Sequence, residues 1–316
     1  MTAGTEGAPV GRSGLTVSKV GFGAAPLGGR SATAEADAQA VETVRYALTH
    51  GCRLIDTAPL YGAGRSERLL GQALAGVDRR DYVLATKVGR IVMSDGTVVF
   101  DFTRDGVLRS LDESLRRLRI DRIDILHIHD ADAHYREALD VVFPVLADLR
   151  GQGVIGAIGA GMNQWQMELE LARSADFDCF LLAGRYTLLE QTAVHAFLPY
   201  CLAHGIAVFL GGVYNSGILA VGAQPGATYN YKAAPSAVVE RVRRIEAVCS
   251  RHGVALHVAA THFPLAHAAI TSIVLGMQSR TEVRAAFDAL ETPVPPELWA
   301  ELRVEELLDE AAPTPS

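Results

Sequence analysis

Three ionisable residues stand at the ends of three successive apolar runs in the 316-residue chain. Asp56 ends RLID, Lys87 ends YVLATK and His129 ends DILHIH, while Tyr61 follows Asp56 in the segment DTAPLYGAGRSE. Because side chains alternate between the two faces of a strand, each strand-end residue shares an inward face with the residue two positions before it. A buried carboxylate is costly unless it is paired, so we expect Asp56 to form an ion pair with Lys87.

These residue types indicate proton transfer at a carbonyl or an alcohol. A free tyrosine has a pKa of about 10, which is too high for ready proton exchange near neutral pH. A lysine ammonium beside Tyr61 stabilises the phenolate and lowers that pKa, and Asp56 holds Lys87 charged and in place. His129, from the next strand, is expected to orient a substrate oxygen by a hydrogen bond. The alternative is a plain structural ion pair, and His127, deeper in the strand, is expected to be a hydrogen-bonded core histidine.

The elements that must position these residues alternate regularly along the chain. Short apolar runs are each followed by a helical stretch at spacings that suit parallel strands with crossover helices. Eight such units, with no linker between them and no GxGxxG after the first strand, predict an α/β fold: a closed (β/α)8 TIM barrel in a single domain over 1–316, ordered from about 10 to 310. The expected strands are Val20–Phe22, Arg53–Asp56, Tyr82–Lys87, Asp124–His129, Ile155–Gly159, Cys179–Ala183, Ile206–Leu210 and Thr271–Leu275. The expected helices are Glu35–His50, Ser66–Ala75, Arg104–Arg119, Tyr135–Gln152, Gln164–Arg173, Thr192–His204, Ser236–His252 and Thr281–Leu290.

Further segments are expected around this frame. Val10–Lys19 predicts an N-terminal hairpin that plugs the bottom of the barrel, and Leu298–Leu308 predicts a C-terminal helix. Two long loops, Gly89–Thr103 and Gly211–Pro235, follow the third and seventh strands. Since the loops after the strands form the active-site face of such a barrel, we expect both to serve function.

Composition excludes several classes of partner. The net charge of −7 and the lack of a basic run argue against nucleic acid, and no run of about 18 apolar residues is present to span a membrane. The N-terminal MTAGTEGAPV lacks a signal-peptide pattern, and the four cysteines form no CxxC pair. We therefore expect a cytoplasmic protein with reduced thiols and no metal site, present as a monomer or homodimer. The cysteines are Cys52, Cys179, Cys201 and Cys249.

At the strand-end residues the chain resembles the aldo-keto reductase superfamily. The family element DTAxxYGxxxSE appears as DTAPLYGAGRSE, its strand-end lysine lies in LATKVG, and its histidine lies in ILHIHD. The resemblance extends from Gly14 to about Leu290. It implies a barrel that binds NAD(H) or NADP(H) across its C-terminal face, with Tyr61 as general acid/base, Lys87 and Asp56 tuning it, and His129 orienting the substrate.

The same resemblance implies cofactor contacts. In GAGMNQW, Asn163 matches the family residue that meets the nicotinamide amide, although Met162 replaces the usual serine, and Ala183 replaces a glutamine on the sixth strand. Tyr186 matches the aromatic ring that stacks on the nicotinamide. The segment that resembles the pyrophosphate-binding loop contains Gly211, Gly212, Ser216, Gly217, Ile218 and Leu219.

The segment GMQSRTEVRAAF resembles the part of the family that holds the adenosine end of the cofactor. It departs from the family at Gln278, where an arginine is common, and at Ala286, where an asparagine often contacts adenine. An arginine pairs a phosphate in bidentate fashion, so its loss favours NAD over NADP unless Arg280 takes its place. The implied contact residues are Gly276, Gln278, Ser279, Arg280 and Glu282.

Several longer phrases resemble the aldose 1-dehydrogenase branch, of the L-fucose, D-threo-aldose and L-galactose type. They are FDFTRDGVLRSLDESLRRL, HIHDAD, GAIGAGMNQW and LAGRYTLLEQ. This resemblance implies oxidation of a cyclic hemiacetal to a lactone, with Phe102, Tyr229 and Tyr231 as candidates to stack on a sugar ring. Pyridoxal 4-dehydrogenation and the reduction of aldehydes or ketones are the alternatives.

Two more distant alternatives come from other classes of protein. The pair His127 and His129 also fits a metal-dependent barrel hydrolase, but later strand ends offer no further ligands. A non-catalytic subunit that senses nicotinamide is opposed by the intact set of Tyr61, Lys87, Asp56 and His129.

Overall fold

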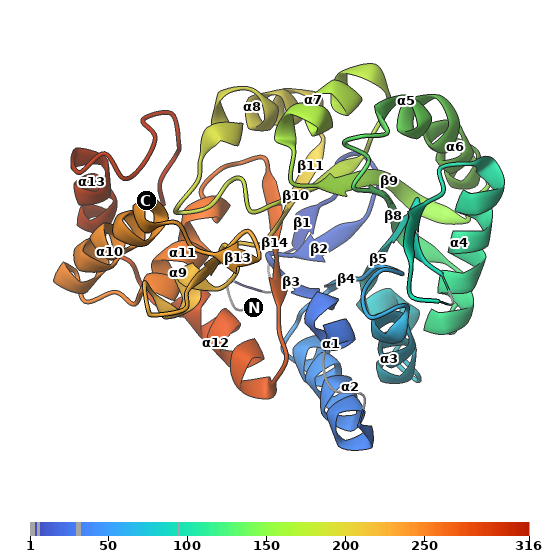
Figure 1. Ribbon diagram of the computed structural model, residues 1–316, viewed down its shortest axis with the longest axis horizontal. Coiled ribbons are helices and arrows are strands. Elements are labelled where there is room, and N and C mark those ends of the chain that lie inside the picture. Colours follow the sequence, from blue (N-terminus) through green and yellow to red (C-terminus); the bar gives the residue numbers. More distant parts are fainter. Residues whose placement is uncertain (1–3, 5–6, 30–32, 94, 316) are drawn as a thin grey trace.

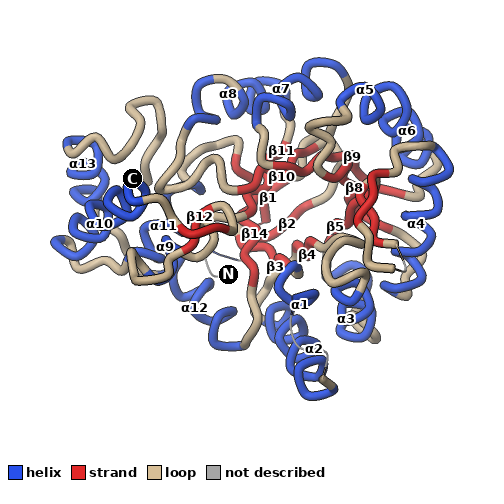
Figure 2. Tube along the Cα trace, in the orientation of Figure 1, coloured by secondary structure: helices blue, strands red, loops and turns tan. Residues whose placement is uncertain are grey.

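The barrel predicted from the sequence is confirmed. The computed structural model of the chain describes residues 4, 7–29, 33–93 and 95–315. Within these residues, eight parallel strands close into a barrel in the order β10, β11, β14, β3, β4, β5, β8 and β9. Figure 2 shows these strands as a central ring with the helices outside it. The strands are β3 (Val20–Gly23), β4 (Leu54–Asp56), β5 (Val83–Val88), β8 (Ile123–His129), β9 (Ile155–Met162), β10 (Cys179–Ala183), β11 (Ala207–Gly211) and β14 (Ile270–Gly276).

The helices that follow the strands begin and end near their predicted limits. Alternation along each strand explains this packing, since outward residues such as Ile55, Leu84 and Leu126 lie in one apolar cluster with the helices. Inward residues such as Leu54 and Ala85 lie in a second cluster inside the barrel. The helices are α1 (Ala25–Gly29), α2 (Ala34–Thr49), α3 (Arg65–Ala73), α4 (Arg104–Leu118), α5 (Tyr135–Glu137), α6 (Phe143–Gly151), α7 (Trp165–Ser174), α8 (Phe197–His204) and α12 (Arg280–Glu291), with short turns η2 (Arg79–Asp81), η3 (Ala138–Val142) and η4 (Thr192–His195).

The helix predicted after the seventh strand needed correction. The sequence predicted Ser236–His252 as the helix of that unit, but α10 (Ser236–Arg251) packs on α11 (Leu256–Leu265) and on α13 (Pro296–Val304). It is α11 that packs against β14. Figure 1 shows α10 and α13 together at one side of the molecule, outside the ring of helices. Most residues of α11 are buried, so the helix carries no clear amphipathic period that the sequence analysis could detect.

Both long loops contain ordered elements. The first forms the hairpin of β6 (Arg90–Val92) and β7 (Val98–Phe100). The second contains α9 (Ile218–Val221) and the hairpin of β12 (Thr228–Tyr229) and β13 (Lys232–Ala233). In the described part of the chain, we find no helix with the length and apolar character needed to cross a membrane.

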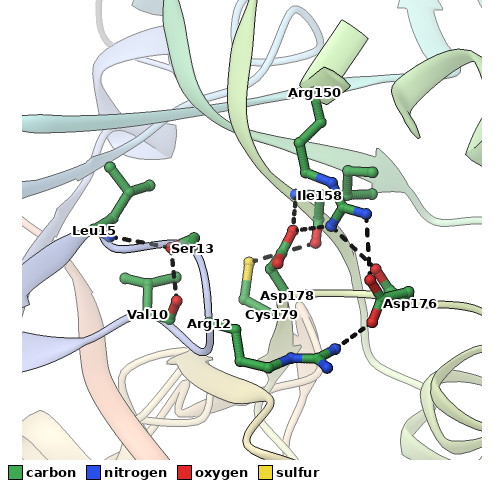
Figure 3. Close-up of polar contacts among 9 residues, drawn as sticks. All are labelled: Val10, Arg12, Ser13, Leu15, Arg150, Ile158, Asp176, Asp178 and Cys179. Carbon is green, nitrogen blue, oxygen red and sulfur yellow. Dashed lines mark hydrogen bonds and ion pairs between the residues drawn. The ribbon is translucent and has the colours of Figure 1, made fainter. Parts of the chain in front are cut away.

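An N-terminal hairpin is present as predicted, but it begins before Val10: its strands are β1 (Gly7–Pro9), in the segment expected to be unordered, and β2 (Thr16–Ser18). Val10 and Val17 are fully buried, in one cluster with the barrel-interior residues that begin β5 and β10. The hairpin therefore closes the end of the barrel where the strands start. Figure 3 shows its turn, in which the Ser13 hydroxyl donates to the Val10 carbonyl at 2.7 Å.

Two aspartates fasten neighbouring strands at this closed end. Asp178 accepts a hydrogen bond from the Ile158 N–H of β9 at 2.8 Å and an ion pair from Arg150 at 2.6 Å (Figure 3). Asp124 makes the same pair of contacts, accepting from the Leu84 N–H of β5 at 2.7 Å and from Arg79 at 2.5 Å. Both carboxylates are almost fully buried, so each must be satisfied in this way. Asp176, an exposed neighbour, pairs with Arg12 of the hairpin.

We predict that Asp178→Asn lowers the free energy of unfolding by about 1 to 3 kcal/mol, because it weakens charge-assisted hydrogen bonds to a buried strand and to Arg150. Denaturant unfolding followed by circular dichroism measures this change. The control is Asp176→Asn, whose exposed carboxylate also contacts Arg150 and should cost less than about 1 kcal/mol. Equal losses in the two variants would show that the strand contact of Asp178 is unimportant.

Candidate active site

Lys87 and Asp56 form the predicted ion pair at the carboxyl ends of β5 and β4. The Lys87 ammonium lies 2.8 Å from each Asp56 carboxylate oxygen and also donates to the Thr57 carbonyl at 2.8 Å. The two residues are only 1% and 4% exposed, so the charges neutralise each other away from water. Burial alone would lower the pKa of Lys87, but Asp56 and Tyr61 raise it above its usual value, and the lysine stays charged.

The Tyr61 ring lies over this pair and beside His129. Lys87 Nζ is 5.0 Å from the centre of the Tyr61 ring, and the His129 ring is 6.2 Å away in an edge-to-face arrangement at 87°. A tight turn holds Tyr61 there, since Gly62, Ala63 and Gly64 all have positive φ. The turn presses against α1, because a Cβ on Gly62 would stand 2.4 Å from the Gly28 carbonyl oxygen. Only glycine combines that backbone conformation with such close contact.

The pKa of Tyr61 differs from the sequence-based expectation. Burial raises it above the usual value, and the Lys87 charge opposes this rise without cancelling it. The expected effect of Lys87 on the phenolate is therefore present, but the expected net lowering was wrong. Sequence alone did not reveal how far the hydroxyl is removed from water, and desolvation disfavours the charged phenolate.

His129 is a neutral hydrogen-bonding group. Burial, the Lys87 ammonium and Arg90 all hold its pKa well below the usual value. Its Nδ1 is buried and has no hydrogen-bond partner among the described residues, and its Nε2 lies 3.8 Å from an Asp130 carboxylate oxygen. A neutral imidazole carries one N–H donor and one acceptor nitrogen, so it is suited to bind the oxygen of an uncharged substrate.

His127 lies one inward position deeper and was expected to be a hydrogen-bonded core histidine. It is fully buried, so the core position is confirmed. Neither ring nitrogen has a partner within normal hydrogen-bond geometry among the described residues, and the Ala160 backbone contributes only a weak contact. Burial and the Lys87 charge lower its pKa to about 3, and it stays neutral. Gly159 makes room for the ring, since a Cβ there would stand 2.2 Å from His127 Nδ1.

The opposite side of the barrel mouth is formed by small residues. In the closed order of strands, β10 lies across the barrel from β4, which leads to Tyr61. Small residues stand at the ends of β9, β10 and β11: a Cβ on Gly161 would lie 3.7 Å from Lys87 Cε, and one on Gly211 would lie 3.8 Å from its nearest neighbour, Ala183 Cβ. Asn163 donates its side-chain amide to the Ala183 carbonyl at 2.7 Å, which fixes it at this mouth. These features fit a nicotinamide beside Lys87 and Tyr61.

Two of the expected cofactor residues lie elsewhere. Tyr186 is fully buried, with its ring packed on Phe263 and His267, and does not reach the mouth, so its assignment to nicotinamide stacking was wrong. Leu219 is also fully buried, and its N–H donates to the Tyr214 carbonyl at 3.1 Å. Leu219 therefore anchors the loop and presents no group to a ligand.

The rest of the expected pyrophosphate loop follows β11 directly. Gly212 and Gly217 have positive φ, and Ser216 accepts a hydrogen bond from the Tyr231 N–H at 3.0 Å. Asn215, which the sequence analysis did not single out, is buried and donates to the Gly184 carbonyl at 3.1 Å. It thus ties this loop to the one that follows β10.

The expected adenosine segment begins at the exposed Gly276 and leads into α12. Ser279 caps the helix by accepting from the Glu282 N–H at 3.2 Å, and Glu282 in turn accepts from the Gln278 N–H at 2.7 Å. Arg280 pairs with Glu42 at 3.1 Å and lies 5.3 Å from the centre of the Tyr46 ring. Both members of the Arg280 pair are more than half exposed, so the guanidinium remains accessible from solvent.

Comparison with known proteins identifies the family. A family model described as "Aldo/keto reductase family" matches residues 19–305. The chain belongs to the aldo/keto reductase family. It is 38% identical to pyridoxal 4-dehydrogenase of Microbacterium luteolum, covering 96% of this chain and 98% of that protein. It is 37% identical to D-threo-aldose 1-dehydrogenase of Pseudomonas sp, covering 96% and 97%. The solved holo form of an aldo-keto reductase from Bacillus halodurans matches with a TM-score of 0.79 at 26% identity, covering 96% and 97%.

Beside the site of this aldo/keto reductase lie two polar residues that the sequence analysis did not single out. Glu67, in the SE of DTAPLYGAGRSE, is fully buried and accepts from Thr86 at 2.7 Å and from Arg117 at 2.6 Å, which ties α3 to β5 and α4 beside Lys87. Asp130 pairs with Arg90 at the mouth. Their positions next to the motif residues Ser66 and His129 were the signal in the sequence that could have identified them.

Among the described residues, no group of three or more His, Cys, Asp or Glu is arranged to hold a metal ion.

We predict that Tyr61→Phe lowers turnover by about 10²- to 10⁴-fold, because it removes the proton-transfer group. Fluorescence titration with reduced nicotinamide cofactor should give a nearly unchanged dissociation constant. The matched control is Tyr135→Phe, whose hydroxyl contacts the Ser174 hydroxyl at the end of α7. Near-normal turnover in Tyr61→Phe would show that another group transfers the proton.

Proposed function

We propose that this aldo/keto reductase is an NAD(P)-dependent aldose 1-dehydrogenase of the D-threo-aldose or L-fucose type, which oxidises the cyclic hemiacetal at C1 to the lactone. The observation that carries the proposal is the grouping of Tyr61 and neutral His129 over the buried Lys87–Asp56 pair. The 37% identity to D-threo-aldose 1-dehydrogenase over nearly the whole chain supports the substrate class.

The residues divide the chemistry among them. When bound, the nicotinamide supplies the acceptor for the hydride that leaves C1. Tyr61 accepts the proton of the anomeric hydroxyl when its own hydroxyl is ionised, a form that burial disfavours and Lys87 favours, so that the C1–oxygen bond becomes a carbonyl. Lys87 stabilises the negative charge on the Tyr61 oxygen, and Asp56 keeps Lys87 charged and fixed. His129 holds the reacting oxygen by a hydrogen bond. Run in reverse, the same groups reduce an aldehyde or ketone, with Tyr61 as the proton donor.

The proposed cofactor contacts follow the mouth from β9 to α12. Asn163 would hold the carboxamide of the nicotinamide, and the loop with Gly211, Gly212, Ser216 and Gly217 would hold the pyrophosphate. The segment with Gly276, Gln278, Ser279, Arg280 and Glu282 would hold the adenosine end. Gln278 offers no charge to a 2′-phosphate, which favours NAD. Arg280 is accessible and could pair with that phosphate, so NADP is the alternative cofactor.

A second candidate function is pyridoxal 4-dehydrogenation. The observation in its favour is the 38% identity to the pyridoxal enzyme, which covers 98% of that protein. The proton transfer by Tyr61 would be the same, since pyridoxal also forms a cyclic hemiacetal that is oxidised to a lactone. Only the groups that surround the substrate would differ.

The direct test mixes the purified protein with NAD or NADP and, in turn, L-fucose, D-arabinose, L-galactose and pyridoxal. We expect reduction of the cofactor, measured by near-ultraviolet absorbance, with at least one of the sugars, and faster with NAD. Tyr61→Phe serves as the inactive control.

Turnover of pyridoxal alone would replace the proposed function with the second candidate. Carbonyl reduction without any oxidation on this panel would contradict both, while the family assignment would stand.

A further inference from the structure

Asp130 adopts an unusual backbone conformation directly beside the proposed catalytic histidine. Its φ is +47°, in the left-handed region, although its N–H still donates to the Gly161 carbonyl of β9 at 3.0 Å. Such a conformation costs energy for a residue other than glycine and persists where the surroundings enforce it, often at functional sites. The turn brings one carboxylate oxygen of Asp130 to 3.8 Å from His129 Nε2.

Arg90 meets Asp130 from a different element. It begins β6, directly after Gly89, and its guanidinium forms an ion pair with the Asp130 carboxylate. The guanidinium carbon lies 5.6 Å from the centre of the Phe100 ring of β7. Phe100 in turn stacks on Phe102 with the ring centres 5.8 Å apart, so two stacked aromatic rings support the arginine side chain. Phe102 itself is buried and does not face a substrate directly.

The pair is built into the mouth and still reachable. The Arg90 and Asp130 side chains are 30% and 27% exposed. The guanidinium has more N–H donors than its contact with Asp130 uses, and the exposed part of the side chain can present them to a ligand. Donors and acceptors are thus available side by side, one residue away from His129.

The charge of the pair limits what it can bind. Asp130 neutralises Arg90, so the two together present no net charge to a phosphate or a carboxylate. An apolar aldehyde would gain nothing from them. A neutral molecule with neighbouring hydroxyl groups can donate to the carboxylate and accept from the guanidinium at once, through charge-assisted hydrogen bonds.

We propose that Arg90 and Asp130 form a specificity subsite that binds hydroxyl groups of the substrate beyond the reacting carbon. The subsite thereby selects neutral polyhydroxylated substrates over simple aldehydes. The inference rests on the proposed function and names the residues that determine its substrate class.

The test compares Arg90→Met and Asp130→Asn with wild type on two reactions. One is oxidation of the best aldose of the panel, and the other is reduction of propanal, which carries no hydroxyl group. Loss of a charged hydrogen bond should lower kcat/KM for the aldose by about 10- to 100-fold, chiefly through KM. The loss for propanal should be at least about tenfold smaller, since a shared effect on His129 would act on both reactions.

Two controls separate binding from folding. Arg116→Met removes an exposed arginine that pairs with Asp112 on the outside of α4, and should leave both reactions unchanged. Asparagine tolerates the left-handed conformation, so Asp130→Asn should retain the thermal unfolding midpoint of wild type. If Arg90→Met unfolds, Asp130→Asn alone decides the outcome.

Equal losses for the aldose and for propanal, or no loss for either, would overturn the subsite while leaving the proposed function intact. Failure of the wild-type protein itself to oxidise any aldose, with pyridoxal or propanal still converted, would instead overturn the proposed function and the subsite together.

Discussion

The buried ion pair between Lys87 and Asp56 is the interaction on which the rest of the site depends. Neither charge is tolerable alone in this interior, since an unpaired buried charge destabilises a fold strongly. The pair forms because β4 and β5 are neighbours in a parallel register that aligns Asp56 with Ala85, two residues before Lys87. The register of the barrel strands therefore fixes the position of the Lys87 ammonium beneath Tyr61.

That one ammonium also sets the protonation of its neighbours. Its charge adds to burial in keeping His127 and His129 neutral, and it opposes the rise that burial imposes on the pKa of Tyr61. The Lys87 charge is thus matched by Asp56, the Arg90 charge by Asp130, and the two histidines stay neutral. This arrangement suits a reaction in which an uncharged substrate exchanges a proton with Tyr61.

Much of this architecture was predictable because it rests on local patterns. The period of two along DILHIH assigns His129 and His127 to one face, and the ionisable strand ends identify the mouth. The helix α11 was missed because most of its residues are buried, which leaves no clear amphipathic period, and because it contains Pro264. Tyr186 was misplaced because the chain turns at Gly184, whose φ is positive, and spacing from a strand does not fix direction beyond such a turn. The Arg90–Asp130 pair joins two loops, which no local pattern records.

The most direct test of the central claim is an ultraviolet titration of tyrosinate at Tyr61. The signal of Tyr61 is isolated by subtracting the spectrum of Tyr61→Phe, first in the wild-type background and then in Lys87→Met. If Lys87 stabilises the phenolate, Tyr61 should ionise at higher pH in Lys87→Met than in wild type. Ionisation at the same or a lower pH in Lys87→Met would contradict the account.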